Sequence, residues 1–184
     1  MSRISSLEVQ LSNVKSLLRT MCDAVNTGLV TLIQHFEHPN PNRLIKIVVL
    51  DSEIDNLERA IDTSILQILA TQQPLGYELR LAYACAKIAH HIERIGDAVE
   101  SLARQLVNGD IPEQKEIFLE MLNDSKALFE RSYTAMFEGD LALIQEIHLL
   151  DDKVDFKQRE LYHIAKNILK KGSKGNIDKA LRII

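Results

Sequence analysis

Acidic side chains recur at helical spacing in two separate segments of the sequence. The first set is Asp51, Asp55, Glu58 and Asp62. The second set is Glu93, Asp97 and Glu100, and His90 precedes them at the same helical spacing. Spacings of three and four residues put each set on one face of an α-helix, where like charges repel by about 0.2–0.5 kcal/mol per pair. Carboxylate oxygens suit hard cations such as Mg²⁺, Ca²⁺, Mn²⁺ or ferric iron, and a histidine can add a nitrogen ligand.

The position of the intervening turn predicts that the two sets meet. The turn is expected near residues 73–74, so Asp55 and Glu93 are almost equally far from it, as are Asp51 and Asp97. At a rise of about 1.5 Å per residue, these pairs have the same heights on adjacent antiparallel helices. Four carboxylates then converge on one patch. Spacing alone leaves three interpretations open: a solvated acidic face, carboxylates paired with Lys or Arg, or a cation site.

The segments that carry these residues are expected to be helices. Gly (7), Pro (4) and aromatic residues (5%) are scarce, and apolar residues recur three and four positions apart between clusters of helix breakers. The expected helices span about 5–36, 42–72, 75–107, 111–137 and 140–171, followed by a stub at about 177–184. Long stripes joined by short loops predict an all-α protein of antiparallel helical bundles.

An internal repeat organises these helices. The segment 50–55, Leu-Asp-Ser-Glu-Ile-Asp, recurs at 150–155 as Leu-Asp-Asp-Lys-Val-Asp. We therefore expect tandem three-helix bundles, with residues 1–109 forming the first and residues 110–184 the second. The second bundle is incomplete in this interpretation, because the sequence supplies two helices and only a stub of the last.

Composition excludes several classes of protein. Apolar residues make up 46% and charged residues 26% of the chain, and the net charge is −4, which favours a globular protein that does not bind nucleic acid. There is no apolar run of about 18 residues, and the N-terminus does not look like a signal peptide. Cys22 and Cys85 form no CxxC motif and are expected to be reduced thiols in a cytoplasmic protein.

One motif in the third expected helix resembles a known family. The run Glu-Arg-Ile-Gly-Asp at 93–97, together with the Asp-xxx-Asp motifs at 51–55 and 151–155, resembles the PhoU family of phosphate-transport regulators. The resemblance implies two tandem three-helix bundles, each holding a metal cluster through acidic pairs from two helices. The implied metals are iron or zinc, and magnesium or manganese fits the same oxygen ligands.

The resemblance assigns metal ligands by position. Those of the first site are Asp51, Asp55, Glu93 and Asp97. Glu58, His90 and Glu100 lie near enough to assist. The second, weaker site retains only Asp151 and Asp155, because the matching acids of a sixth helix are absent. The chain also departs from the family pattern at Ala98, where a histidine is common, and at Gln158 and Tyr162, which stand where the second helix has Glu58 and Asp62.

The same resemblance implies a function. It implies a peripheral, non-enzymatic regulator that restrains phosphate import, with the ATPase subunit of the phosphate ABC transporter and a membrane sensor histidine kinase as partners. No phosphate-binding glycine loop or catalytic motif such as HExxH occurs, which agrees with a non-enzymatic role. The alternatives are a metal-free helical scaffold and an accessory domain of another phosphate or ion transporter.

Two further expectations concern assembly. The apolar stripes of the fourth and fifth helices would lack a third helix, so we expect a homodimer that covers them. The basic stretch from Lys166 to Arg182 is either a solvated helix end or a contact with an anionic membrane surface or the transporter.

Overall fold

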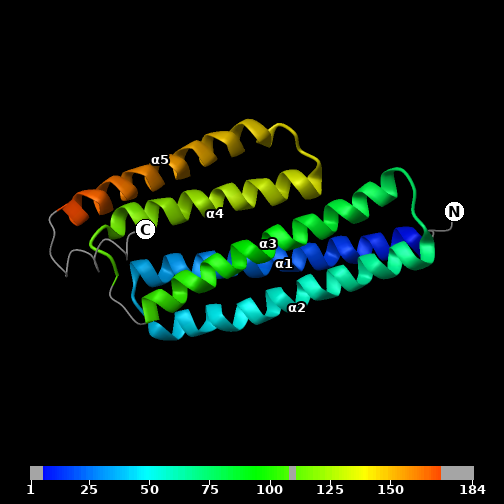
Figure 1. Cartoon of the computed structure of the whole chain (residues 1–184), viewed down its shortest axis with the longest axis horizontal. Helices are drawn as coiled ribbons and strands as arrows, with labels where there is room; N and C mark the ends of the chain where they lie inside the picture. The colour runs from blue at the N-terminus through cyan, green and yellow to red at the C-terminus, as the bar shows by residue number, and fades with distance from the viewer. Residues whose placement is uncertain (1–5, 108–110, 171–184) are drawn as a thin grey trace. The chain divides into compact units, whose positions relative to one another are not determined.

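The computed structural model describes residues 6–107 and 111–170, and within those ranges it contains five α-helices and no strand. The helices are α1 (Ser6–Glu37), α2 (Pro41–Gln72), α3 (Tyr77–Val107), α4 (Lys115–Glu138) and α5 (Leu143–Lys170) (Figure 1). The expected all-α class is confirmed. The expected stub at 177–184, the expected boundary between residues 109 and 110, and the basic stretch beyond residue 170 lie outside the described residues.

Local sequence explains where α2 begins and ends. Asn40 is its N-cap, and the Asn40 side chain accepts a hydrogen bond from the Asn42 N–H at 3.0 Å. Pro41 follows at the first helical position, where its missing N–H costs nothing. The helix stops at Gln73, which adopts the left-handed conformation (φ 47°), and Gly76 (φ 58°) completes the turn into α3.

The second pair of helices begins later than the sequence indicated. The structure starts α4 at Lys115 rather than near 111, and the preceding Gln114 makes no side-chain cap. Gly139 ends α4 in the left-handed conformation (φ 69°), and the Asp140 side chain then accepts a hydrogen bond from the Ala142 N–H at 2.9 Å. This capped turn delays the start of α5.

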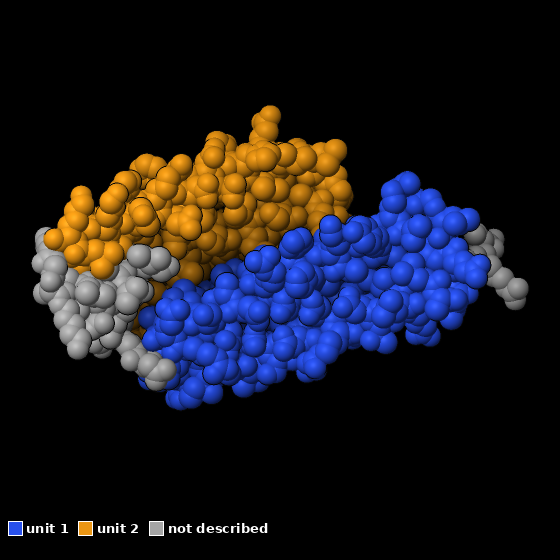
Figure 2. Space-filling model, viewed as in Figure 1, with its two compact units in different colours: residues 1–32, 40–108 blue, residues 33–39, 109–184 orange. Residues whose placement is uncertain are grey.

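By their internal contacts, the residues form two compact units (Figure 2). The first unit comprises residues 1–32 and 40–108, and the second comprises residues 33–39 and 109–184. Most of α1 belongs to the first unit with α2 and α3, whereas its last residues belong to the second with α4 and α5.

The core of the first unit follows the apolar stripes of its helices. The buried residues of α1 in this unit recur three and four positions apart and include Leu11, Val14, Leu18, Met21, Val25, Leu29 and Leu32. Those of α3 include the small residues Ala82, Ala89, Gly96 and Ala103. Small residues let helices pack closely together. Gly28 of α1 faces Val99 of α3 in this way, because a Cβ atom at Gly28 would lie 3.2 Å from the Val99 side chain.

The core of the second unit is built around aromatic rings. Phe36, in the part of α1 that belongs to this unit, is fully buried and stacks on Phe118 of α4 with ring centroids 6.1 Å apart. Phe129 of α4 and Leu161 of α5 are also buried. No helix in the described ranges combines the length and apolarity that crossing a bilayer requires.

Candidate metal centre

The acidic residues of α2 and α3 gather into two adjoining groups. The two helices follow one another through a short turn and lie side by side in the first unit (Figure 1). The first group consists of Glu58, His90 and Glu93. The second group consists of Asp51, Asp55 and Asp97. Within each group, one potential ligand atom from every residue lies within 4.8 Å of the others.

This grouping differs in one detail from the arrangement expected at equal heights. Glu93 meets Glu58 rather than Asp55, and Asp97 lies with both Asp51 and Asp55. Side chains on a helix lean toward its N-terminus, so those of two antiparallel helices lean in opposite directions. An α3 residue therefore meets an α2 residue whose Cα atom is nearer the connecting turn.

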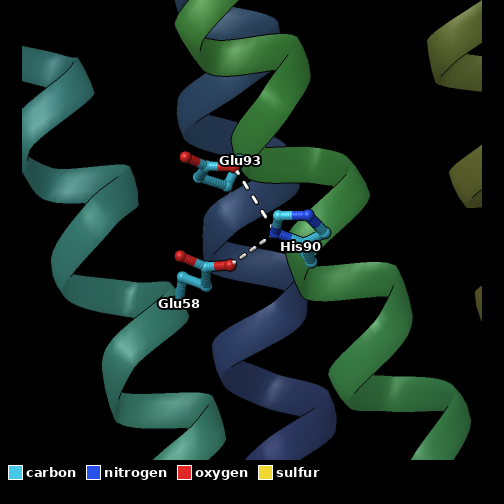
Figure 3. Close-up of side chains that lie close together, drawn as sticks. All are labelled: Glu58, His90 and Glu93. Atoms are coloured by element: carbon cyan, nitrogen blue, oxygen red, sulfur yellow. Dashed lines mark hydrogen bonds and ion pairs between the residues drawn. The ribbon is translucent and has the colours of Figure 1, made fainter.

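A histidine joins the carboxylates of the first group. The close-up in Figure 3 shows Glu58 on α2 facing His90 and Glu93 on α3. The His90 Nδ1 atom lies 3.1 Å from Glu58 Oε1 and 3.7 Å from Glu93 Oε2. The His90 side chain is 62% exposed, whereas those of Glu58 and Glu93 are 22% and 18% exposed. The exposed imidazole therefore lies against two half-buried carboxylates.

The second group contains a carboxylate with an unsatisfied buried oxygen. The Oδ1 atom of Asp51 is shielded from solvent and has no hydrogen-bond partner among the residues that the structure describes. Burial raises the pKa of Asp51, and the negative charges of Glu100, Asp55 and Asp97 raise it further. A buried polar atom without a partner costs about 1–3 kcal/mol, so this oxygen calls for an explanation.

Glu93 connects the two groups. Burial is the largest cause that raises the pKa of Glu93, followed by the charge of Asp97 and then that of Glu58. A hydrogen bond with the Asp97 side chain also raises it, and the charge of His90 opposes the change. Asp51 in one group and Glu93 in the other thus bind protons more tightly than isolated carboxylates, which is expected where negative charges converge without enough compensation.

Few cations compensate this charge. Within residues 6–107 and 111–170, neither Asp51, Asp55 nor Asp97 forms an ion pair with lysine or arginine. Glu100 pairs with Arg104, one turn further along α3, and the Arg104 charge lowers the pKa of Asp51. The salt-bridge interpretation therefore accounts for Glu100 alone among the α3 carboxylates of this patch.

A glycine allows the two helices to approach at the site. Gly96 is buried on α3, and a Cβ atom there would lie 3.0 Å from Ile54 Cδ1 and 3.3 Å from Ile54 Cγ2. Ile54 stands between Asp51 and Asp55 on α2, and Gly96 stands next to Asp97 on α3. The missing side chain at Gly96 thus shortens the distance that the carboxylates must span.

The donor set fits a cation. Six side chains on two rigid helices offer carboxylate oxygens and one imidazole nitrogen, and one oxygen is buried without a partner. Three carboxylates suit magnesium or manganese, whereas a group with histidine and two carboxylates also suits iron or zinc. A bound cation would satisfy the Asp51 oxygen and offset the repulsion between α2 and α3.

The equivalent acids of the second unit are not gathered in this way. Asp151 and Asp155 are exposed on α5, and in the described part of the chain neither belongs to a group of three potential ligands. Gln158 and Tyr162, one and two turns further on, are also exposed and cannot replace carboxylates.

Sequence reasoning missed an ionic contact between α4 and α5. The Nζ atom of Lys157 bonds to Asp124 and lies 3.4 Å from Glu120. These bonds raise the pKa of Lys157, although burial opposes them. The signal was present in the i, i+4 spacing of Glu120 and Asp124, but only the packing of α4 on α5 shows which cation they share.

Comparison with known proteins agrees with the fold and the acidic motifs. The family model described as "PhoU domain" matches residues 18–106 and 118–184. The "Phosphate-specific transport system accessory protein PhoU homolog 1" of Thermotoga maritima is 26% identical, over 96% of this chain and 77% of that protein. The PhoU homolog of Clostridium acetobutylicum is 27% identical, over 88% of this chain and 76% of its own length.

A solved structure gives the same result for the fold. The crystal structure of PhoU from Pseudomonas aeruginosa superimposes with a TM-score of 0.86 at 22% identity, and the match covers 97% of this chain and 87% of that one. The names of the related proteins describe accessory proteins rather than enzymes, in agreement with the non-enzymatic role expected from the sequence. The family match and the shared architecture show that this chain belongs to the PhoU family.

Proposed function

We propose that this chain is a metal-binding regulator of phosphate uptake. Its relatives in Thermotoga maritima and Clostridium acetobutylicum are named as accessory proteins of the phosphate-specific transport system, which supports the same system for this chain. In this proposal the protein restrains import by the phosphate ABC transporter and damps the phosphate-starvation response. It acts in the cytoplasm as a homodimer, and its partners are the ATPase subunit of the transporter and a sensor histidine kinase.

The metal-binding part of the proposal depends mainly on one observation. The Asp51 Oδ1 atom is buried close to other carboxylates, and in the described part of the chain it has no hydrogen-bond partner. Such an atom is costly in a metal-free protein, whereas a cation would use it as a ligand. We assign Asp51, Asp55 and Asp97 as oxygen ligands, and Glu93 with Glu58 and His90 as a second set.

The two sets favour different metals. Because Asp51, Asp55 and Asp97 offer only oxygen atoms, they suit magnesium or manganese. The group that contains His90 suits iron or zinc. When bound, the cation supplies positive charge that ties α2 to α3. We expect Glu100 to have a supporting role, since it is already paired with Arg104.

A genetic experiment tests the regulatory role. Deletion of the gene should raise phosphate uptake and starvation-gene expression in phosphate-replete cells, and the intact gene should restore restraint. Complementation with Asp55→Asn/Glu93→Gln then shows whether metal binding is needed. Unchanged uptake and expression in the deletion strain under both replete and limiting phosphate would refute the regulatory role.

A matched pair of variants tests the metal site separately. Asp55→Asn with Glu93→Gln removes one ligand charge from each group in the first unit and should remove most bound metal. Asp155→Asn changes the equivalent acid of the second unit, which is exposed and, within the described ranges, belongs to no group of three potential ligands. This variant should leave the metal content almost unchanged. Elemental analysis and calorimetric titration give the comparison. Equal metal loss in both variants would contradict the asymmetry.

Two alternatives predict different results. A metal-free scaffold would bind its partner equally well after chelation, and the Asp55→Asn/Glu93→Gln variant would complement fully. An accessory domain of another phosphate or ion transporter would co-purify with that transporter rather than with the ATPase subunit of the phosphate ABC transporter. If that transporter carries a different ion, deletion would also leave phosphate uptake unchanged.

A further inference from the structure

One face of α5 carries two large apolar side chains that are exposed (Figure 1). Phe156 is 65% exposed and Leu149 is 63% exposed. They are seven residues apart, so they lie one above the other on the same face of the helix. Aromatic residues are enriched in protein interfaces. Six exposed residues form this face, which we call the α5 surface: Leu149, Asp152, Lys153, Phe156, Arg159 and Glu160.

The charges around Phe156 form a regular pattern. The residues four and three positions before it are Asp152 and Lys153. Those three and four positions after it are Arg159 and Glu160. Because a helix turns about 100° per residue, Asp152 and Arg159 lie on one side of Phe156. Lys153 and Glu160 lie on the other side. Each side therefore carries one acid and one base, and these four charges sum to zero.

The four charged residues have no ion-pair partner within the described part of the chain. The acid and the base on each side are seven residues apart, which is about 10.5 Å along the helix. Ion pairs along a helix need spacings of three or four residues. The acid and the base on one side therefore cannot satisfy each other, and both can pair with another molecule.

A helix packed on α5 as α3 packs on α2 would not cover the α5 surface. The internal repeat relates α5 to α2 by 100 positions, so Asp151 and Asp155 correspond to Asp51 and Asp55, which lie close to Asp97 of α3. The α2 positions that correspond to most of the α5 surface are exposed although α2 packs on α3: 49, 52, 53, 56 and 59. The equivalent face of α5 would therefore stay exposed as well.

A second copy of the chain supplies the opposite charges. In a two-fold interface each contact occurs twice, so the surface must be complementary to itself. When two α5 helices meet antiparallel about Phe156, Asp152 lies opposite Arg159 of the copy. Lys153 then lies opposite Glu160. When they meet parallel, Asp152 lies opposite Lys153, and Arg159 lies opposite Glu160. In every pair the heights along the helices agree to about 1.5 Å.

We propose that a second copy of this chain docks on the α5 surface, with the two Phe156 rings at the centre of the contact. This assignment rests on the homodimer in the proposed function and specifies its interface. The balanced charge of the α5 surface disfavours anionic lipid and nucleic acid, which attract an excess of basic residues. The first unit does not repeat the pattern, because Ser52 and Asn56 stand where α5 has Asp152 and Phe156.

Sedimentation velocity of the full chain tests the apolar part of the contact. Because the dimer contains two copies of Phe156, Phe156→Ala should raise the dimer dissociation constant at least about 30-fold. The matched control is Tyr83→Ala, because Tyr83 is an aromatic residue of α3 that is 63% exposed. This control should dimerise as the unmodified chain does. Circular dichroism shows whether each variant retains its helices.

Charge reversal tests the pairing. Asp152→Lys/Glu160→Lys makes all four charges basic, and Lys153→Glu/Arg159→Glu makes all four acidic. Each variant alone should be monomeric where the unmodified chain is a dimer, because like charges then meet in either alignment. An equimolar mixture of the two variants should form a heterodimer, which also shows that both are folded.

A control for the change in net charge comes from the first unit. Asp23→Lys/Glu53→Lys alters the charge by the same amount as the basic variant, at two exposed positions. It should leave the dimer intact.

The results separate this interface from the rest of the proposed function. A dimer that survives Phe156→Ala and both charge reversals would overturn the α5 interface and leave the homodimer standing through another surface. Failure of the mixed variants to associate would refute the charge pairing and, with it, the docking of a second copy here. An unmodified chain that stays monomeric at high micromolar concentration would overturn both the interface and the homodimer. The regulatory role is decided separately, by the deletion strain.

Discussion

Replacing Gly96 with alanine would test how closely α2 and α3 must approach at the acidic site. The new Cβ atom would lie 3.0 Å from Ile54 Cδ1 and 3.3 Å from Ile54 Cγ2. Both distances are shorter than an ordinary van der Waals contact, and Ile54 is buried and branched at Cβ, so its side chain has few alternative positions. The substitution should therefore push α2 away from α3 between Asp51 and Asp55.

Two opposing contributions decide the effect on stability. Alanine is favoured over glycine in a helix interior by about 1 kcal/mol, which would stabilise the protein. Overpacking a core costs about 1–3 kcal/mol, because neighbouring side chains must leave their preferred rotamers. We expect the free energy of unfolding to fall by roughly 0–2 kcal/mol in net terms. Metal affinity should fall as well, because the ligands on α2 and α3 move apart.

A double-mutant cycle identifies Ile54 as the cause. Ile54→Val removes the Cδ1 atom that lies nearest the new side chain. In the unmodified protein this change should cost about 0.5–1.5 kcal/mol. Combined with Gly96→Ala, it should cost less and should restore part of the metal affinity. Urea unfolding measures stability, and calorimetric titration measures metal binding.

The reasoning has a clear point of failure. If Gly96→Ala raised the free energy of unfolding by the full value of about 1 kcal/mol and bound metal as tightly as the unmodified protein, then close approach at Gly96 would not matter. The absence of coupling between the Gly96 and Ile54 substitutions would lead to the same conclusion.

The raised pKa values in the acidic site and the ion pairs of the second unit give separate predictions. Burial and neighbouring carboxylates raise the pKa values of Asp51 and Glu93. The folded metal-free protein therefore binds protons more tightly than the unfolded chain does. The free energy of unfolding of the metal-free protein should then rise as the pH falls from neutrality toward the ordinary carboxyl range. Urea unfolding across that range should show a weaker rise for Asp51→Asn/Glu93→Gln, and identical profiles would contradict the assignment. Lys157→Ala should lower stability by about 1–3 kcal/mol, because Asp124 remains half-buried without its cation. Arg131→Ala, which breaks an exposed pair, should cost less than about 1 kcal/mol, and equal losses in the two variants would refute the distinction.

The sequence by itself determined the helices and the faces that carry the acids. Helix periodicity is local: spacings of three and four residues place Asp51 with Asp55, and Glu93 with Asp97, whatever the rest of the chain does. The expected turn near 73–74 lies within the connection that the structure shows between α2 and α3. These features were sufficient to predict an all-α protein in which the acidic faces of two adjacent helices lie close together.

Only the tertiary structure decided how the acids are divided and which of them are buried. Whether Glu93 meets Asp55 or Glu58 depends on the lean of side chains from two antiparallel helices, which equal residue counts ignore. The burial of Asp51 Oδ1 and the close approach of Ile54 to Gly96 both arise from the packing of the helices, which residue spacing does not specify.

The same limit applies to the first helix and the second acidic motif. Periodicity predicted one continuous α1, but not that Phe36 at its end would stack in the core of the second unit. The motif at 151–155 repeats the spacing at 51–55, yet its acids are exposed on α5. A repeated spacing fixes which residues share a helical face, whereas burial and ligand geometry depend on the side chains that a neighbouring helix brings to that face.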